Sequence, residues 1–269
     1  AIRQIMRFQD KMDQTYGRNR RRTSIGLYEF DLVKPPLHFT VAKPREVSFV
    51  PLEFDERMTL EEILEKHPKG RAYGHIVRQF EVWPIFMDSE NQVLSFPPII
   101  NSNDLGRITE ETRNVLIEVT GTSYETVLDT LINVTVALAD RGGKIHSAVI
   151  HYPYMGMTDD VTPNLDVDTF SLDISYVQKI IGLKLSASEI KSLLEKSRYG
   201  IAEFSERKIV VKVPCYRVDV LHPIDIVEDI AIAYDYNKIP PEWPQLATIG
   251  GLSNETSFRD LFREIMVGL

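Results

Sequence analysis

Four acidic side chains in one short stretch are the residues of this chain best suited to bind a cation. Asp225, Glu228 and Asp229 are spaced three and four residues apart, so they share one face of a predicted helix. Asp219 precedes them on a predicted short strand, residues 216–221. No lysine or arginine stands at the helical spacing that would pair these acids. The spacing therefore indicates three adjacent negative charges on the helix, with a fourth nearby.

Two interpretations explain why these charges are tolerated. The helix begins at Pro223, a residue favoured in the first turn, and the helix macrodipole stabilises acids there by about 0.3–1 kcal/mol each. Alternatively, the three helical carboxylates and Asp219 bind a hard cation such as Mg²⁺, which takes a few carboxylates and retains water ligands. Spacing alone leaves both interpretations open.

A second group of polar residues follows the pair Pro97 and Pro98. Two consecutive prolines hold the backbone extended, and the polar run Asn101–Asp104 after them is not typical of a core strand. Rigid loops of this kind often position functional residues. The next predicted strand, residues 115–122, is apolar but has Glu118 at its centre. If buried, this carboxylate must be hydrogen-bonded, paired or functional; if the strand alternates, it faces solvent. Both remain open.

The strongest positive run is Gly17–Arg22, with four arginines in six residues. These side chains could contact phosphate groups, or form a solvated turn whose charges pair with the acidic remainder of the chain. The net charge of −8 argues against a free-standing nucleic-acid binder, because phosphate contacts need a basic surface. A locally basic patch is compatible with that charge.

The composition excludes several classes of protein. The 269 residues suffice for two domains, and the single cysteine, Cys215, excludes a disulfide framework and a cysteine-rich zinc site. No apolar run is long enough to span a membrane and no signal peptide is recognisable, so we expect a cytoplasmic protein. The sequence contains no P-loop, dinucleotide fingerprint, HExxH motif or serine elbow.

The order of predicted elements is mixed, without strict alternation of strands and helices, which predicts an α+β fold. We expect a mixed-sheet domain at residues 1–157 and a small winged-helix-like α+β domain at 158–243. Residues 244–269 would be a linker and the start of a further module. The expected helices are 1–16, 60–66, 72–80, 124–139, 174–181, 190–198 and one from 223; the expected strands are 24–32, 38–41, 47–52, 83–87, 93–96, 115–122, 145–152, 170–172, 201–204, 208–213 and 216–221.

Several motifs in the same order resemble the beta subunit of phenylalanyl-tRNA synthetase, archaeal and eukaryotic type. The resemblance runs nearly end to end. One departure is Asp235, where the family usually has glycine between two tyrosines. The matching motifs are Arg7–Lys11, Gly17-Arg18, Ile25-Gly26, Pro97–Ser102, Arg107–Thr109, Ile117–Thr122, Tyr216–Asp219 and His222–Asn237.

This resemblance implies that the chain is a central fragment whose residues 1–157 are an editing domain. Such a domain hydrolyses tyrosine mischarged onto the phenylalanine tRNA. We expect Glu118 to accept a hydrogen bond from the phenol, and Asn101 and Ser95 to hold the aminoacyl group or a water. Backbone N–H groups around Thr120–Gly121–Thr122 would bind the ester carbonyl oxygen. No nucleophile is evident, so we expect attack by a positioned water, with the terminal ribose hydroxyl of the tRNA as a second possible aid.

The resemblance also implies that Asp219, Asp225, Glu228 and Asp229 are ligands of a Mg²⁺ ion shared with the catalytic alpha subunit. The partners would be that subunit, in a heterotetramer of two alpha and two beta chains, and tRNA(Phe). ATP and the attachment of phenylalanine would belong to the full enzyme alone. The alternative is a non-catalytic assembly or tRNA-binding module.

Overall fold

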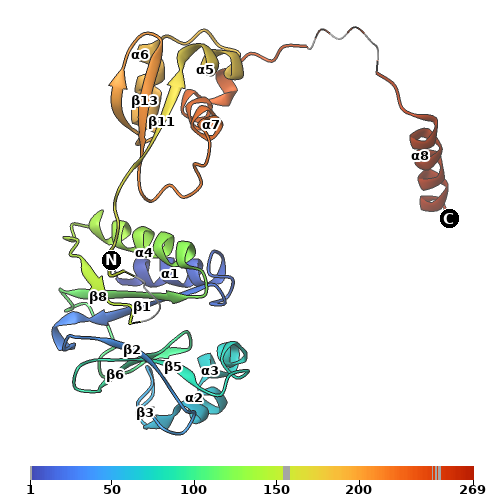
Figure 1. The fold of residues 1–269 in the computed structure, drawn as a ribbon. Helices are drawn as coiled ribbons and strands as arrows, with labels where there is room; N and C mark the ends of the chain where they lie inside the picture. Colours follow the sequence, from blue (N-terminus) through green and yellow to red (C-terminus); the bar gives the residue numbers. More distant parts are fainter. Residues whose placement is uncertain (1, 154–157, 244, 246, 248–249) are drawn as a thin grey trace.

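The computed structural model describes residues 2–153, 158–243, 245, 247 and 250–269 (Figure 1). Its mixture of helices and antiparallel sheets is an α+β fold, as predicted. The elements up to residue 162 are α1 (Ile2–Gln14), β1 (Thr23–Glu29), η1 (Phe30–Leu32), β2 (His38–Ala42), β3 (Ser48–Phe49), β4 (Met58–Thr59), α2 (Leu60–Lys66), α3 (Pro68–Tyr73), η2 (Gly74–Ile76), β5 (Trp83–Met87), β6 (Val93–Phe96), β7 (Ile100–Asn101), β8 (Val115–Gly121), α4 (Tyr124–Ala139), β9 (Ala148–Ile150) and β10 (Asp160–Thr162).

The later elements begin with a strand that pairs with β13. They are β11 (Asp168–Asp173), α5 (Ile174–Ile181), α6 (Ala187–Lys196), β12 (Gly200–Phe204), β13 (Lys208–Val213), α7 (Pro223–Tyr234), η3 (Tyr236–Lys238) and α8 (Asn254–Val267). No helix in the described residues combines the length and the apolar character that crossing a bilayer requires.

An antiparallel ribbon of β1 and β8 separates two groups of side chains. Helices α1 and α4 lie on one side of this ribbon (Figure 1). Because side chains alternate along a strand, Ile25 and Leu27 of β1 share one face, and they pack with Ile5 of α1 and Val134 of α4. The intervening residue Gly26 lies on the other face of the ribbon, directly opposite Glu118 in the pairing. The face of β1 and β8 that carries Glu118 therefore turns away from these helices.

A four-stranded antiparallel sheet, in the order β2-β5-β6-β7, is the largest sheet of the first unit. Strands β5 and β6, at the predicted positions, form an antiparallel hairpin. Helix α2 starts, as expected, at residue 60, where Thr59 and Glu62 form a capping box, and it buries Leu60 and Ile63 in the core beneath this sheet. Strands β6 and β7 pair at Ser95 and Asn101, so the sheet brings these two polar residues together.

Residues 168–238 form a separate small core of their own. The sheet β11-β13-β12 packs against α5, α6 and α7, with Leu172, Ile190, Ile209 and Ile226 fully or almost fully buried. Helix α6 starts at a capping box of Ser186 and Glu189, earlier than the expected start at residue 190. Helix α7 begins at Pro223, as predicted, and places the acidic residues near its N-terminus.

Two predicted elements are wrong. Residues 72–80 do not form one helix, because Pro68 already starts α3, and the chain then continues as the short turn η2. Residues 216–221 form turns rather than a strand, so Asp219 lies in a loop. The predicted strands 24–32 and 145–152 are shorter than expected, at Thr23–Glu29 and Ala148–Ile150. The predicted domain boundary after residue 157 lies outside the described residues.

Candidate functional site

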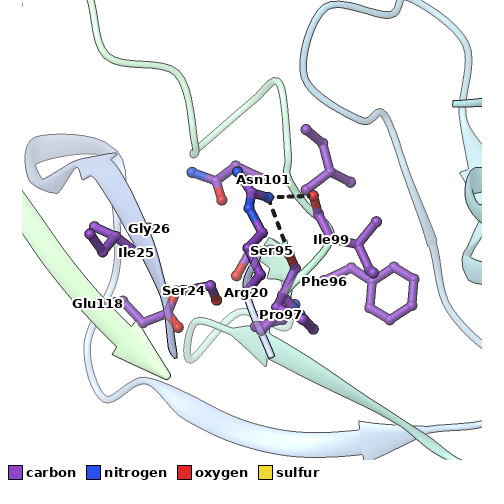
Figure 2. A pocket seen from close by; sticks show the side chains of 12 residues that line it. Arg20, Ser24, Ile25, Gly26, Ser95, Phe96, Pro97, Ile99, Asn101 and Glu118 are labelled. Carbon is purple, nitrogen blue, oxygen red and sulfur yellow. Dashed lines mark hydrogen bonds between the residues drawn. The ribbon is translucent and has the colours of Figure 1, made fainter. Parts of the chain in front are cut away.

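A narrow pocket lies between the β1–β8 ribbon and the turn that joins β6 to β7 (Figure 2). Its lining includes three of the predicted site residues, Ser95, Asn101 and Glu118, which come from three different strands. The cavity has a volume of about 20 Å³, room for about one water molecule. The fold therefore brings together residues that the sequence analysis singled out separately.

Glu118 is a buried hydrogen-bond acceptor in this pocket. Its Oε1 is shielded from solvent and has no hydrogen-bond partner among the described residues. Burial raises the pKa of Glu118, an effect that the hydroxyl groups of Tyr28 and Thr120 oppose. Glu118 as a whole is half-buried, but its carboxylate does not face solvent, because Oε1 is shielded and Oε2 accepts a hydrogen bond from the buried Tyr28.

Tyr28 is the site residue that sequence analysis missed. Its side chain is fully buried, and its Oη lies 2.5 Å from Glu118 Oε2 and 2.8 Å from Ser95 Oγ. When Glu118 is ionised it only accepts hydrogen bonds, so the single Tyr28 proton goes to Glu118 and Ser95 donates to Tyr28. Burial, followed by the charge of Glu118, raises the pKa of Tyr28. One hydroxyl therefore connects Ser95 to one oxygen of Glu118 and leaves the other oxygen free.

Gly26 makes room for this arrangement. A Cβ atom at residue 26 would lie 2.3 Å from Tyr28 Oη and 2.5 Å from Glu118 Oε2. Both distances are far below van der Waals contact, so a side chain here would displace one of the two groups. Gly26 and Tyr28 are two residues apart on β1, so they lie on the same face of the strand. Had the pairing of Gly26 with Glu118 been known, this spacing would have indicated Tyr28 as a neighbour of Glu118.

The remaining predicted residues have mainly structural contacts. Asn101 Nδ2 donates to the carbonyls of Leu27, at 3.3 Å, and Gly106, at 3.4 Å, and so connects β7 to β1. Thr120 Oγ1 lies 3.4 Å from Ser24 Oγ, which belongs to a residue of the pocket lining. Gly121 is packed closely, because a Cβ there would lie 2.1 Å from the carbonyl oxygen of Arg22. The N–H of Thr122 donates to that same carbonyl and is not free to bind a ligand.

Arg20 turns inward from the basic run and lines the pocket (Figure 2). Its Nη1 donates to the carbonyls of Pro98 and Ile99 at 3.1 and 3.0 Å, and its Nε lies 2.9 Å from Asp13 Oδ2. Its guanidinium also stacks over Tyr73, 4.5 Å from the ring centroid. Burial raises the pKa of Asp13 to about 6, against the lowering effect of Arg20. Arg20 therefore fastens the Pro97–Pro98 turn over the pocket.

Two of the four acids around α7, Asp219 and Asp229, pair with a cation that helical spacing did not indicate. Arg217 donates to both carboxylate oxygens of Asp219 at 2.8 Å, and its Nη2 also lies 2.8 Å from Asp229 Oδ2. Asp229 accepts a further hydrogen bond from Tyr199 Oη at 2.5 Å. No lysine or arginine pairs these acids at helical spacing, as noted from the sequence, but Arg217 reaches Asp219 and Asp229 from the turn that precedes the helix.

Asp225 and Glu228, unlike Asp219 and Asp229, do not contact Arg217. Asp225 accepts hydrogen bonds from the N–H groups of Leu221 and His222, at 2.9 and 2.7 Å, and so completes the N-terminal cap of α7. Glu228 is exposed, with no side-chain partner among the described residues. No three His, Cys, Asp or Glu side chains in the described part of the chain are grouped to hold a metal ion. The acids do not fit a bound cation while Arg217 occupies two of them, and the magnesium site stays a prediction.

Replacing Arg217 with methionine is expected to lower the free energy of unfolding of the chain by about 1–3 kcal/mol, because the half-buried Asp229 loses its cation. The Arg217 hydrogen bond lowers the pKa of Asp219. The contribution of this ion pair to stability is fully present above the pKa of Asp219 in the unfolded chain, about 4. It is lost as the pH falls through the lower pKa of Asp219 in the folded chain. Urea unfolding at pH 7 and at pH 3 measures both effects.

The matched control for Arg217→Met is Lys238→Met. The pair of Lys238 with Asp235 is exposed and 4.0 Å long, so its loss is expected to cost less than about 0.5 kcal/mol. Equal stability of Arg217→Met and the unmodified chain at pH 7 would contradict the role assigned to the arginine.

Comparison with known proteins finds relatives that match the whole length of the chain. Phenylalanine–tRNA ligase beta subunits are similar to it throughout: that of Pyrococcus furiosus is 47% identical over 268 residues, that of Thermococcus kodakarensis 46% over 268, and that of Archaeoglobus fulgidus 43% over 270. The chain belongs to the phenylalanine–tRNA ligase beta-subunit family. All of this chain is covered in these matches, but only 48%, 46% and 48% of the relatives, so it spans about half their length.

A family model and a crystal structure give two further similarities. Residues 170–236 match the family model described as the tRNA synthetase B5 domain, which contains Arg217 and the four acids. A crystal structure of an N-terminal fragment of the phenylalanyl-tRNA synthetase beta subunit from Pyrococcus horikoshii is similar, with a TM-score of 0.83 and 45% identity. That match covers 87% of this chain and 66% of the other.

Proposed function

We propose that this part of the beta subunit hydrolyses the ester that links tyrosine to mischarged tRNA(Phe). The observation that supports this proposal is the unpartnered, buried Oε1 of Glu118 in a pocket shared with Ser95 and Asn101. A buried acceptor without a donor costs about 1–3 kcal/mol, so a ligand that supplies a hydroxyl hydrogen is favoured over one that does not.

This acceptor solves a specific problem of selectivity. Tyrosine differs from phenylalanine by one hydroxyl, and an apolar synthetic site cannot strongly reject a ligand that merely adds one. A second site that hydrogen-bonds the hydroxyl selects tyrosine instead, because bound phenylalanine would leave the acceptor of that site unpaired. Glu118, with one oxygen held by Tyr28 and one free, has the chemistry of such a site.

The proposed reaction is attack by water on the ester. The water oxygen forms a bond to the ester carbonyl carbon, and the bond between that carbon and the ribose oxygen breaks. The ribose oxygen takes up a proton from the attacking water. Asn101 and Ser95 hold the aminoacyl group or the water, and the N–H of Gly121 stabilises the developing oxyanion, because the N–H of Thr120, like that of Thr122, faces β1 in the ladder. Because Ser95 is joined to Glu118 through Tyr28, its hydroxyl also orders the phenol acceptor. No covalent intermediate with the enzyme is formed.

The pocket must widen for this reaction. Its volume of about 20 Å³ is far smaller than the roughly 300 Å³ at which ligand pockets usually begin. The Arg20 hydrogen bonds to Pro98 and Ile99 hold the turn that closes it. The narrowness favours a second candidate function, that of a non-catalytic assembly or tRNA-binding module of the synthetase.

In the complete enzyme we propose that the chain supports attachment of phenylalanine to tRNA(Phe) with ATP, together with an alpha subunit in a two-alpha, two-beta assembly. Asp219, Asp225, Glu228 and Asp229 would offer carboxylates to a Mg²⁺ ion there, once Arg217 has left Asp219 and Asp229. Anomalous scattering from Mn²⁺ beside Asp225 in crystals of the complete enzyme tests the metal.

A deacylation assay separates the two candidate functions. The purified chain is expected to release tyrosine from tyrosyl-tRNA(Phe) well above the rate in buffer, and to release phenylalanine from phenylalanyl-tRNA(Phe) much more slowly. If tyrosine stays attached at the buffer rate, the hydrolytic function fails and the non-catalytic module is the better interpretation.

A further inference from the structure

The basic loop Gly17–Arg22 divides into one buried and three exposed arginines. Arg20 is 11% exposed and is held by Asp13 and by two backbone carbonyls. Arg18, Arg21 and Arg22 are exposed, and their guanidinium groups make no ion pair or hydrogen bond in the described part of the chain. In a chain with a net charge of −8, three neighbouring cations without an acidic partner are a feature that needs an explanation.

The backbone of this loop is rigid and unusual. Arg18, Asn19 and Arg20 all have left-handed conformations, with φ of 49°, 55° and 63°. Such conformations are costly for residues other than glycine and persist only where the surroundings enforce them. Here Arg20 N donates to Asp13 O at 3.1 Å and Arg22 N to Gly17 O at 2.9 Å. The three exposed guanidinium groups therefore project from a fixed frame.

The loop is fastened to the end of β8 beside the candidate site. Thr122 donates to it twice, from its N–H to Arg22 O at 2.9 Å and from its Oγ1 to Arg21 O at 3.1 Å. Arg20, in the middle of the same loop, lines the pocket together with Asn101 and Glu118 (Figure 2). The exposed arginines are thus within a few residues of a side chain that contacts the pocket interior.

We propose that Arg18, Arg21 and Arg22 bind the phosphates of the single-stranded 3′ end of the tRNA whose ester enters the pocket. This inference rests on the proposed function for the identity of the ligand. An ester bound in the pocket continues outward as a polynucleotide with one phosphate per nucleotide. Guanidinium groups bind phosphate oxygens through paired, charge-assisted hydrogen bonds, and arginines are unmatched by lysine in that geometry. Arg20 lines the pocket, so the other three arginines lie within two residues of a pocket residue along the chain.

The salt dependence of RNA binding tests this site. The probe is a fluorescent single-stranded RNA with the 3′-terminal sequence of tRNA(Phe) and a free terminal hydroxyl. In the variant R18Q/R21Q/R22Q, the Kd is expected to rise about tenfold or more. The slope of log Kd against log salt is expected to fall by about 2, since each phosphate contact on a single strand contributes about 0.7.

The matched control removes the same charge elsewhere. K43Q/K144Q/K179Q replaces three exposed lysines that have no ion pair in the described part of the chain, and its salt slope is expected to equal that of the unmodified chain. An RNA with neutral methylphosphonate linkages is expected to bind the unmodified chain and the arginine variant equally. If the triple variant fails to fold, each single arginine variant is expected to lower the slope by about 0.7.

An unchanged salt slope in the arginine variants would overturn the proposal. The readout is also separate from the test of the hydrolytic function. If the unmodified chain binds the RNA through these arginines but does not release tyrosine, the hydrolytic function fails and the phosphate site stands. If the unmodified chain releases tyrosine but the arginine variants leave the salt slope unchanged, the hydrolytic function stands and the phosphate site fails.

Discussion

Replacing Glu118 with glutamine is expected to lower the preference of the chain for the tyrosyl ester over the phenylalanyl ester by roughly 10- to 100-fold. The carboxylate Oε1 is a charged acceptor without a partner, and a hydrogen bond to a charged group contributes about 1.5–3 kcal/mol. Glutamine keeps the shape but offers one neutral acceptor, for which Tyr28 and the substrate phenol compete. The ratio of kcat/KM for the two aminoacyl-tRNAs measures the loss.

The control for this substitution is Glu125→Gln, which changes the same functional group at an exposed position of α4. Its preference for tyrosine is expected to equal that of the unmodified chain. A Glu118→Gln variant that still hydrolyses both esters in the original ratio would show that another group recognises the phenol.

Replacing Gly26 with alanine is expected to lower the free energy of unfolding by about 3 kcal/mol and to abolish the preference for tyrosine. The new Cβ would meet Tyr28 Oη at 2.3 Å and Glu118 Oε2 at 2.5 Å, so overpacking would break the hydrogen bond between these two groups. Chemical unfolding and the deacylation ratio together measure the effect. The loss of selectivity should be at least as large as in Glu118→Gln.

Two further variants identify the cause. Gly251→Ala introduces the same methyl group where no atom lies within 4 Å, and it is expected to leave both measurements unchanged. Tyr28→Phe combined with Gly26→Ala removes the closer of the two clashing atoms, so it is expected to recover part of the stability. If Gly26→Ala is as stable as the unmodified chain, the tight packing at this position is not a constraint.

Elements with strong local signals were predicted almost residue by residue. Helix α4 was expected at residues 124–139 and is Tyr124–Ala139, since its apolar face and flanking polar residues determine both ends. The capping boxes at Thr59 and Ser186 determine the starts of α2 and α6, because side chain and backbone satisfy each other locally there. Helix α2 begins at residue 60 as expected, whereas α6 begins at Ala187 rather than at residue 190. The α+β class followed from the order of these elements.

The candidate site was only partly predictable, because its geometry depends on contacts between distant segments. Ser95, Asn101 and Glu118 were named individually, and the structure brings them to one pocket. Tyr28 was missed because its role depends on the register of β1 against β8, which no local pattern encodes. Arg217 was missed because helical spacing was the only pairing considered, whereas it reaches Asp229 from a preceding turn.

The hydrogen bond between Tyr28 and Glu118 has a consequence for the range of amino acids that the pocket distinguishes. A carboxylate has two oxygens, and the phenol of the chain's own tyrosine occupies one of them. On the proposed function, a bound aromatic ring with a single hydroxyl finds one vacant acceptor, whereas a catechol, with two adjacent hydroxyls, finds only one acceptor on Glu118 for its pair. The number of hydroxyl groups that this site recognises is therefore set by residue 28, and variation at that position would alter which modified phenylalanines are removed from tRNA.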